Sequence, residues 1–188
     1  MFIETEKTPN PETLKFLPGQ ALLEKGTAEF SDPEQAERYS PLADRLFAVA
    51  GVKNIFIGRD FVSITKDETW DWNVLKPMLL TALMQHLTFN EPIVLESYFT
   101  KKPQTETSGE DNEIVVQIKA LLDERVRPAV AQDGGDIEFD SFEDGILYLR
   151  MRGACAGCPS STLTLKSGIE NMMKHYIPEV AAVEAVTL

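Results

Sequence analysis

The organisation of this chain is set by residues 100–111, which read TKKPQTETSGED. This stretch contains no aliphatic or aromatic side chain, so it has no group with which to join a hydrophobic core. We therefore expect a flexible polar linker at residues 100–111, between a first domain at residues 1–99 and a second at residues 112–188. Each part is long enough to form a small core of its own.

The first domain combines helix and strand signals, which predicts an α+β fold. Ser40 is expected to cap a helix that begins at Pro41 and is ended by Gly51, because serine accepts backbone N–H groups and proline fits the first turn. Residues 52–57 and 61–65 are apolar stretches on either side of a short glycine-containing turn, and they predict a β-hairpin.

A second helix of this domain is expected to begin after Asp71. The spacing of its apolar residues predicts that Val74 and Met78 belong to the buried stripe. Pro77 lies too far from the start to be a first-turn proline, so a kink or break is expected there. His86 is interpreted as a residue of the helix surface.

The second domain is also predicted to be α+β. Pro128 is expected to strain or end its first helix, residues 137–140 and 146–152 predict a hairpin, and a further helix is expected to begin near Ser160. Residues 180–186 complete the small sheet. The buried face of the last helix is expected to comprise Leu165, Ile169, Met172, Met173 and Tyr176.

The overall charge excludes several classes of partner. The chain carries 18 basic and 30 acidic side chains, a formal net charge of -12, which argues against binding to nucleic acid or to an anionic membrane surface. The N-terminal residues lack the basic flank and apolar core of a secretory signal, and no apolar run approaches the roughly 20 residues that span a bilayer. We expect a soluble protein of a bacterial cytoplasm, or of the mitochondrial matrix if a transit peptide has been removed.

The two cysteines of the chain are its strongest functional feature. Cys155 and Cys158 lie between a predicted strand and a predicted helix, and they are flanked by Gly153, Gly157 and Pro159. Unpaired N–H groups and the positive end of a helix dipole are expected to lower the thiol pKa there and to favour thiolates, which are the form that binds metal. A disulfide-stapled scaffold is excluded by so low a count.

The residues alone leave four interpretations of this pair open. The cysteines are small buried side chains, a thioredoxin-like dithiol–disulfide oxidoreductase pair, half of a zinc site shared between chains, or half of an iron–sulfur site. The predicted helix–hairpin–helix–strand order differs from the strand-first order around a thioredoxin-like pair. Zinc would need ligands from a second chain, since His86 and His175 lie far from the cysteines along the sequence.

The count of two cysteines fits an iron–sulfur cluster that is shared between two chains. A cluster takes four thiolates and one chain has two cysteines, so two chains that meet at Cys155 and Cys158 would hold one cluster about a twofold axis. Such a cluster lies at the interface and is shared between subunits. This arrangement favours cluster transfer over electron storage.

A series of motifs follows in order along the chain: Thr8-Pro9-Asn10-Pro11, Ser40-Pro41-Leu42-Ala43, residues 60–66, Arg127-Pro128, Asp133-Gly134-Gly135-Asp136, residues 153–166 and Gly168-Ile169-Glu170. Through these motifs the chain resembles the two-domain, Nfu-type members of the NifU-like iron–sulfur protein family. The resemblance covers nearly the whole chain.

This resemblance implies that Cys155 and Cys158 bind a 4Fe-4S cluster between the two subunits of a homodimer. The cluster is expected to come from upstream cluster-assembly proteins and to be passed to apo iron–sulfur client proteins, so the protein is a scaffold or carrier and not an enzyme. A 2Fe-2S form as a stage on the way is left open. The first domain is expected to contact clients or partners.

Four acidic residues of the second domain are interpreted as a solvated edge: Asp133, Asp136, Glu138 and Asp140. A calcium loop gathers its oxygens around one tight turn, whereas the acids from Asp136 onward alternate along a predicted strand.

Overall fold

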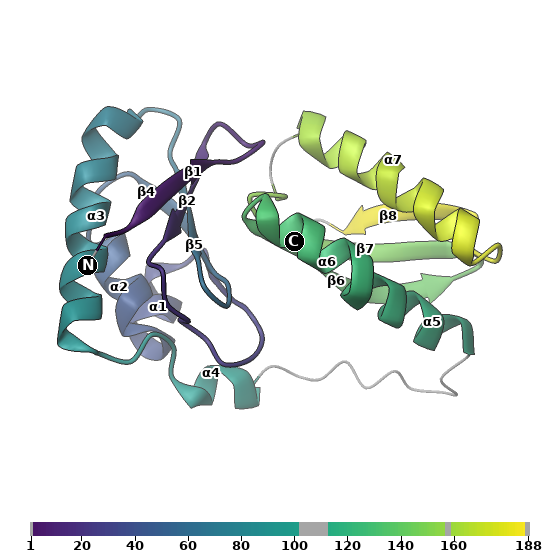
Figure 1. Cartoon of the computed structure of the whole chain (residues 1–188), viewed down its shortest axis with the longest axis horizontal. Helices are drawn as coiled ribbons and strands as arrows, with labels where there is room; N and C mark the ends of the chain where they lie inside the picture. Colours follow the sequence, from purple (N-terminus) through teal and green to yellow (C-terminus); the bar gives the residue numbers. More distant parts are fainter. Residues whose placement is uncertain (1, 102–112, 157–158, 187–188) are drawn as a thin grey trace. The chain divides into compact units, whose positions relative to one another are not determined.

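The computed structural model describes residues 2–101, 113–156 and 159–186. The chain forms two compact units, residues 1–104 and 105–188, each with its own sheet and helices (Figure 1). The predicted α+β class with two domains is confirmed. Helix α4 (Glu96–Lys101) contains Thr100 and Lys101, which the sequence prediction places in the linker, and the rest of that linker lies outside the described residues.

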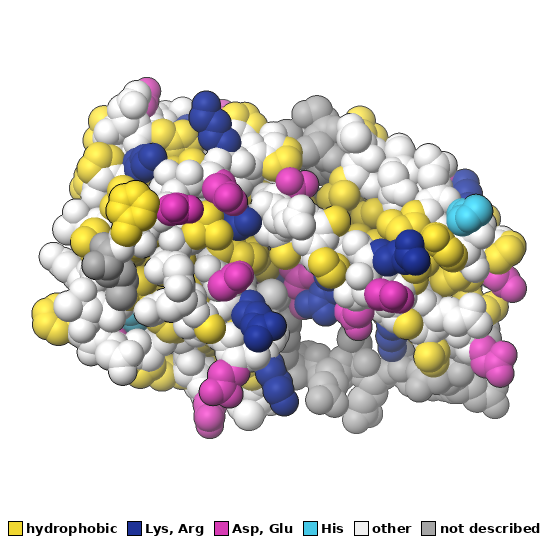
Figure 2. Space-filling model, in the orientation of Figure 1, with side chains coloured by type: hydrophobic (Ala, Val, Ile, Leu, Met, Phe, Trp, Pro, Cys, Tyr) yellow, Lys and Arg dark blue, Asp and Glu magenta, His cyan; other side chains and the backbone are white. Residues whose placement is uncertain are grey.

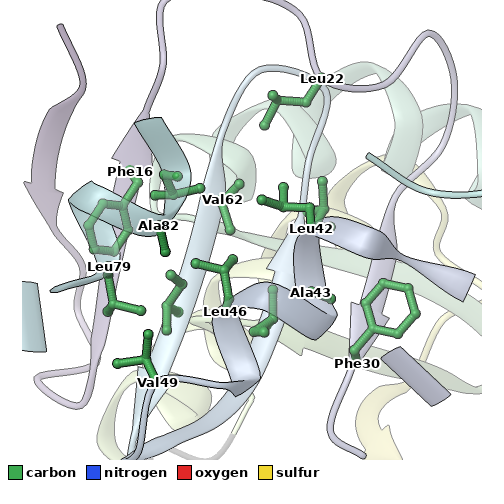
Figure 3. Close-up of a cluster of buried hydrophobic side chains, with 14 of the residues drawn as sticks. Phe16, Leu22, Phe30, Leu42, Ala43, Leu46, Val49, Val62, Leu79 and Ala82 are labelled. Carbon is green, nitrogen blue, oxygen red and sulfur yellow. The ribbon is translucent and has the colours of Figure 1, made fainter. Parts of the chain in front are cut away.

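The first unit is built on a five-stranded antiparallel sheet in the order β1-β2-β5-β4-β3, which confirms the predicted hairpin as β4 and β5. Side chains from the sheet and from α2 and α3 form one core, in which Phe16, Leu46 and Leu79 are fully buried (Figure 3). The elements are β1 (Glu4–Lys7), β2 (Thr13–Leu17), β3 (Ala28–Phe30), α1 (Pro33–Tyr39), α2 (Pro41–Phe47), β4 (Val52–Ile57), β5 (Val62–Lys66) and α3 (Trp72–Phe89).

Helix α2 begins as predicted but ends earlier. The hydroxyl of the buried Ser40 accepts a hydrogen bond from the Ala43 N–H at 3.0 Å and donates one to the Ile93 carbonyl at 2.6 Å. The helix ends at Phe47, and Gly51 lies beyond it in the turn before β4. Its φ of 96° lies in the left-handed region that glycine adopts without strain.

Helix α3 confirms its predicted cap and corrects part of its predicted buried stripe. The Asp71 carboxylate accepts a hydrogen bond from a first-turn N–H at 2.7 Å, as predicted, but the helix continues through Pro77 without a break. Val74 and Met78 are 52% and 46% exposed, so they do not belong to the buried stripe. The buried residues of the helix are Leu75, Leu79, Ala82, Leu83, His86 and Leu87.

His86 is fully buried, which corrects its interpretation as a surface residue. Its Nε2 lies 3.2 Å from the Pro92 carbonyl oxygen, and its Nδ1 lies 3.5 Å from Glu91 Oε2. Burial lowers the pKa of His86 and outweighs the opposing effect of the Glu91 carboxylate, which binds Arg45 through two hydrogen bonds of 3.0 Å. These contacts fasten the segment after α3 onto α2 and α3.

The second unit has a three-stranded sheet in the order β6-β7-β8. Strand β6 (Gly135–Glu143) pairs antiparallel with β7 (Ile146–Gly153), and β8 (Ala182–Val186) lies parallel to β7. The predicted hairpin turn is confirmed, with Asp144 at φ 50° and Gly145 at φ 80°, which is the left-handed pair of a two-residue type I′ loop.

The helical segment of this unit changes character before Pro128. Helix α5 (Glu113–Leu121) passes through a π-helical turn (Leu122–Val126) into α6 (Arg127–Gln132). Proline lacks an N–H and its ring crowds the preceding turn, and a wide turn at that point accommodates both effects. The π-helical turn thus lies just before Pro128, and the helical path does not end there.

Helix α7 (Pro159–Tyr176) begins close to the predicted Ser160 and crosses one face of the sheet (Figure 1). Ile169 and Met173 are buried as predicted. Tyr176 is 48% exposed, which corrects the prediction, and its ring centre lies 4.9 Å from Arg125 Cζ.

The surfaces of both units carry Asp and Glu side chains, as Figure 2 shows, in keeping with the net charge of -12. In the part of the chain that the structure describes, no helix is both long and apolar enough to cross a membrane.

Candidate functional site

The candidate site is the turn that joins β7 to α7. Strand β7 ends at Gly153, Cys155 follows in the turn, and α7 begins at Pro159. Gly153 has a φ of 62°, and its carbonyl accepts a hydrogen bond from the Ala156 N–H at 3.1 Å, which closes the turn around Cys155. Cys158, the second candidate ligand, lies outside the described residues.

A second turn lies against the first. Asp133 and Gly134 connect α6 to β6, and Gly134 follows the end of α6 with a φ of 82° and an N–H that donates to the Ala131 carbonyl at 3.1 Å. The Gly134 carbonyl accepts a hydrogen bond from the Ala154 N–H at 3.2 Å. The two glycine-containing turns are therefore tied together next to Cys155.

Gly135 fits the cysteine because it has no side chain. A Cβ at this position would lie 2.5 Å from Cys155 Sγ and 2.7 Å from the Arg152 carbonyl oxygen, both well inside van der Waals contact. Gly135 is not among the positive-φ glycines of the chain, so glycine is required here for space rather than for backbone conformation.

The surroundings of Cys155 contradict the predicted lowering of its thiol pKa. The residue is 6% exposed, and burial raises the pKa of its thiol to about 12, with the carboxylates of Asp133 and Asp136 adding to the rise. Reactive dithiol pairs depend on a lowered thiol pKa, so this setting is unlike that of an oxidoreductase.

Asp136 is not part of a solvated edge. Its side chain is 5% exposed, and Arg127 binds both carboxylate oxygens, with Nε–Oδ1 at 2.8 Å and Nη2–Oδ2 at 2.9 Å. The Ile137 N–H also donates to Asp136 Oδ1 at 2.8 Å. The ion pair therefore connects α6 to the first residues of β6, directly beside the cysteine turn.

Glu138 and Asp140 of β6 are also paired. Glu138 lies 2.5 Å from Arg152 and Asp140 lies 2.6 Å from Arg150, across the β6–β7 pairing. The sequence contained a signal for this, because two arginines two residues apart on one strand of a hairpin match acids two apart on the other. No group of three or more His, Cys, Asp or Glu side chains suited to a metal ion occurs among the residues described.

Comparison with known proteins relates both units to described families. The family "Scaffold protein Nfu/NifU N terminal" matches residues 3–90, and the family "NifU-like domain" matches residues 118–184. The human NFU1 iron-sulfur cluster scaffold homolog, mitochondrial, is 50% identical over 188 residues, which cover 99% of this chain and 72% of the human protein. This chain belongs to the Nfu family of NifU-like proteins.

A plant relative agrees with this placement. The Arabidopsis thaliana NifU-like protein 4, mitochondrial, is 48% identical over 186 residues, covering 98% of this Nfu-family chain and 65% of the plant protein. The solution structure of a NifU-like protein from Saccharomyces cerevisiae matches with a TM-score of 0.47 and 30% identity, over 51% of this chain and 86% of the yeast chain. This Nfu-family chain thus spans about two thirds of the length of its plant relative.

Proposed function

We propose that this Nfu-family chain is an iron–sulfur cluster scaffold or carrier. Cys155 and Cys158 of each of two chains bind one 4Fe-4S cluster, which the protein receives from cluster-assembly proteins and passes to apo iron–sulfur clients. The observation that carries the proposal is the position of Cys155, in a glycine-bounded turn between β7 and the start of α7, in a chain with two cysteines. The names of the human and plant relatives support the scaffold role.

The donor set fits this cargo better than a resident metal ion. A cluster takes thiolate ligands, and the cysteine count supplies half of the four that it needs. A second chain related by a twofold axis supplies the other half, and the two copies of the Cys155 turn would then face each other. A closed zinc site would need further side-chain ligands, which the described neighbours of Cys155 do not provide.

The role requires binding and release, and we propose no turnover of a substrate. A cluster held by two thiolates from each subunit can leave when client thiols replace the protein's own. The names of the relatives favour the mitochondrial matrix over the bacterial cytoplasm as the compartment. The first unit is proposed to contact clients or partners.

Anaerobic reconstitution tests the proposal. The full chain is incubated with ferrous iron, sulfide and a reductant, and iron, sulfide and the visible absorption are measured after desalting. We expect about four iron atoms for every two chains. Cys155→Ser and Cys158→Ser should each lose most of the bound iron, whereas Ala156→Ser, a change in the same turn that removes no thiol, should retain it.

A transfer assay completes the test. The reconstituted protein is mixed with an apo 4Fe-4S enzyme, and recovery of that enzyme's activity is followed in the presence of an iron chelator. Recovery is expected with the unaltered chain and with Ala156→Ser. Normal iron binding by Cys155→Ser would remove the ligand assignment, and an iron-free monomer that cycles between dithiol and disulfide would favour the oxidoreductase instead.

A further inference from the structure

The Cys155 thiol lies inside the second unit rather than on its surface. The residue is 6% exposed and belongs to the core cluster that includes Ile118, Leu149 and Ile169. Its sulfur rests on the backbone of Gly135, in space that a Cβ there would occupy. Its own chain therefore covers the sulfur.

A shared cluster requires a different position for this sulfur. A thiolate that bonds to an iron atom between two subunits has to reach past the surface of its own chain. A sulfur that packs against Gly135 has one side filled by the backbone of β6, and the remaining exposure of the residue is small. The observed position thus suits a protected thiol and not a bridging ligand.

Two local backbone hydrogen bonds are among the contacts around the thiol. The Ala154 N–H bonds to the Gly134 carbonyl at 3.2 Å, and the Ala156 N–H bonds to the Gly153 carbonyl at 3.1 Å. The turn at residues 133–136 is itself fixed by the ion pair between Arg127 and Asp136. An ion pair therefore fixes the surface that shelters the thiol, and the hydrogen bond from Ala154 to Gly134 ties the cysteine turn to that surface.

Each of the two turns that the Ala154–Gly134 hydrogen bond joins contains a glycine with a positive φ. Gly134 has a φ of 82° and Gly153 a φ of 62°, and glycine moves between left-handed and right-handed backbone regions with little steric cost. Such residues commonly absorb the backbone rotation when a loop changes position. Gly153 is the last residue of β7 and pairs with Gly135, so rotation there would carry Cys155 away from Gly135 while leaving the β6–β7 pairs from Asp136 and Arg152 onward in place.

We propose that the cluster-free chain shelters the Cys155 thiol against Gly135 and that the thiol has to swing outward, about Gly153, before it can bind a cluster. The outward step rests on the proposed function, whereas the sheltered state is a property of the cluster-free chain alone. Loading would then be gated by a local opening of the turn, which protects the thiol from reaction when no cluster is present.

Two measurements on the iron-free full chain test the sheltered state. In Cys158→Ser, Cys155 is the one thiol, and its alkylation by iodoacetamide is timed in native buffer and in denaturant at the same pH. We expect native alkylation to be at least about tenfold slower. Amide hydrogen exchange at Ala154, which does not depend on thiol ionisation, should be slowed as well, because opening breaks its bond to Gly134. Equal alkylation rates in the two buffers would overturn the proposal.

The urea dependence distinguishes local opening from unfolding. A local opening exposes little surface, so the alkylation rate should stay nearly constant in urea below the unfolding transition. A rate that rises with urea as steeply as global unfolding would show that the turn does not open by itself. That result would overturn the proposed swing.

A matched pair of alanine substitutions tests the role of Gly135. Gly135→Ala places a methyl group on the sulfur and should speed Cys155 alkylation about tenfold or more, whereas Gly168→Ala, whose added Cβ has no atom within 4 Å apart from its neighbours in α7, should not change it. The added methyl group also meets the Arg152 carbonyl, so amide exchange of β7 is measured to check that the sheet persists. If the sheet is lost in this variant, the alkylation and amide-exchange measurements on the chain with Gly135 test the proposal instead. An unchanged rate in a folded Gly135→Ala chain would overturn the assignment of Gly135.

None of these experiments uses iron, so the two proposals fail separately. A chain that shelters Cys155 but takes up no cluster would contradict the proposed function. A chain that takes up a cluster but reacts at Cys155 as fast as the unfolded chain would contradict the sheltered thiol.

Discussion

In each of the two units, one glycine leaves room for a side chain that a Cβ at its position would displace. In the first, a Cβ at Gly58 would lie 2.4 Å from Phe61 Cε1, and in the second a Cβ at Gly135 would lie 2.5 Å from Cys155 Sγ. Neither glycine has a positive φ, so both are needed for the space they leave. In one unit this space holds an aromatic ring, and in the other it holds a thiol.

The two side chains, Phe61 and Cys155, differ in the turns that hold them. Phe61 follows the β4–β5 turn, which the Gly58 N–H closes by bonding to the Phe61 carbonyl at 2.9 Å, and its ring lies 5.9 Å from that of Phe56. Cys155 stands in a turn that begins at the positive-φ Gly153. We infer that the same close contact fixes a structural ring in one unit and holds a releasable ligand in the other.

The largest loss of stability is expected when a side chain at position 58 fills the space next to the Phe61 ring. Gly58→Ala forces the Phe61 ring out of its position and should lower the stability of the first unit by about 3 kcal/mol, since overpacking costs about 1–3 kcal/mol. Both tryptophans of the chain, Trp70 and Trp72, lie in this unit, so urea denaturation followed by tryptophan fluorescence reports it selectively. Cys155 alkylation should not change. An unaltered fluorescence transition would show that the two glycine contacts are not alike.

The next effect concerns the surface against which the thiol rests. Arg127→Met keeps the aliphatic stem but removes the cation from the buried Asp136, which should cost the second unit about 2 kcal/mol, less than a fully buried pair because Arg127 is partly exposed. Amide exchange of β7 measures this loss. Arg125→Met, which removes an exposed arginine beside Tyr176, is the matched control and should have a much smaller effect. Equal losses in both variants would contradict the role given to the ion pair.

The smallest effect is a pH dependence of the first unit. Its buried His86 has a lowered pKa, so below the ordinary histidine pKa of about 6.5 the unfolded chain binds a proton that the folded chain resists. Stability is therefore fully present above that pH and falls as the pH is lowered from 7 to 5.5. Tryptophan fluorescence in urea measures the fall, and His86→Gln should reduce the slope. An equal slope in His86→Gln would assign the dependence to other groups, among them Glu91.

Features encoded in neighbouring residues could be predicted from the sequence. The serine cap before Pro41, the Asp144-Gly145 turn and the strand at residues 137–140 are local signals, and the structure contains each of them. The position of Cys155 between a strand and a helix was predictable for the same reason.

Features that depend on tertiary packing were not predictable. Val74 and His86 exchange their expected environments because the face that α3 turns to the core is decided by the sheet and α2. The Cys155 pKa follows from burial against Gly135, which is 20 positions away in sequence, and no local pattern indicates that contact. The pairing of Asp136 with Arg127 likewise joins two elements through the fold.

The account depends most directly on two chains sharing one cluster through Cys155 and Cys158. Native mass spectrometry of the anaerobically reconstituted full chain measures chains and iron in the same particle. We predict a species of two chains with one four-iron cluster, which returns to single chains when a chelator removes the iron. A complete cluster on a single chain, or a two-chain species that persists unchanged without iron, would contradict the account.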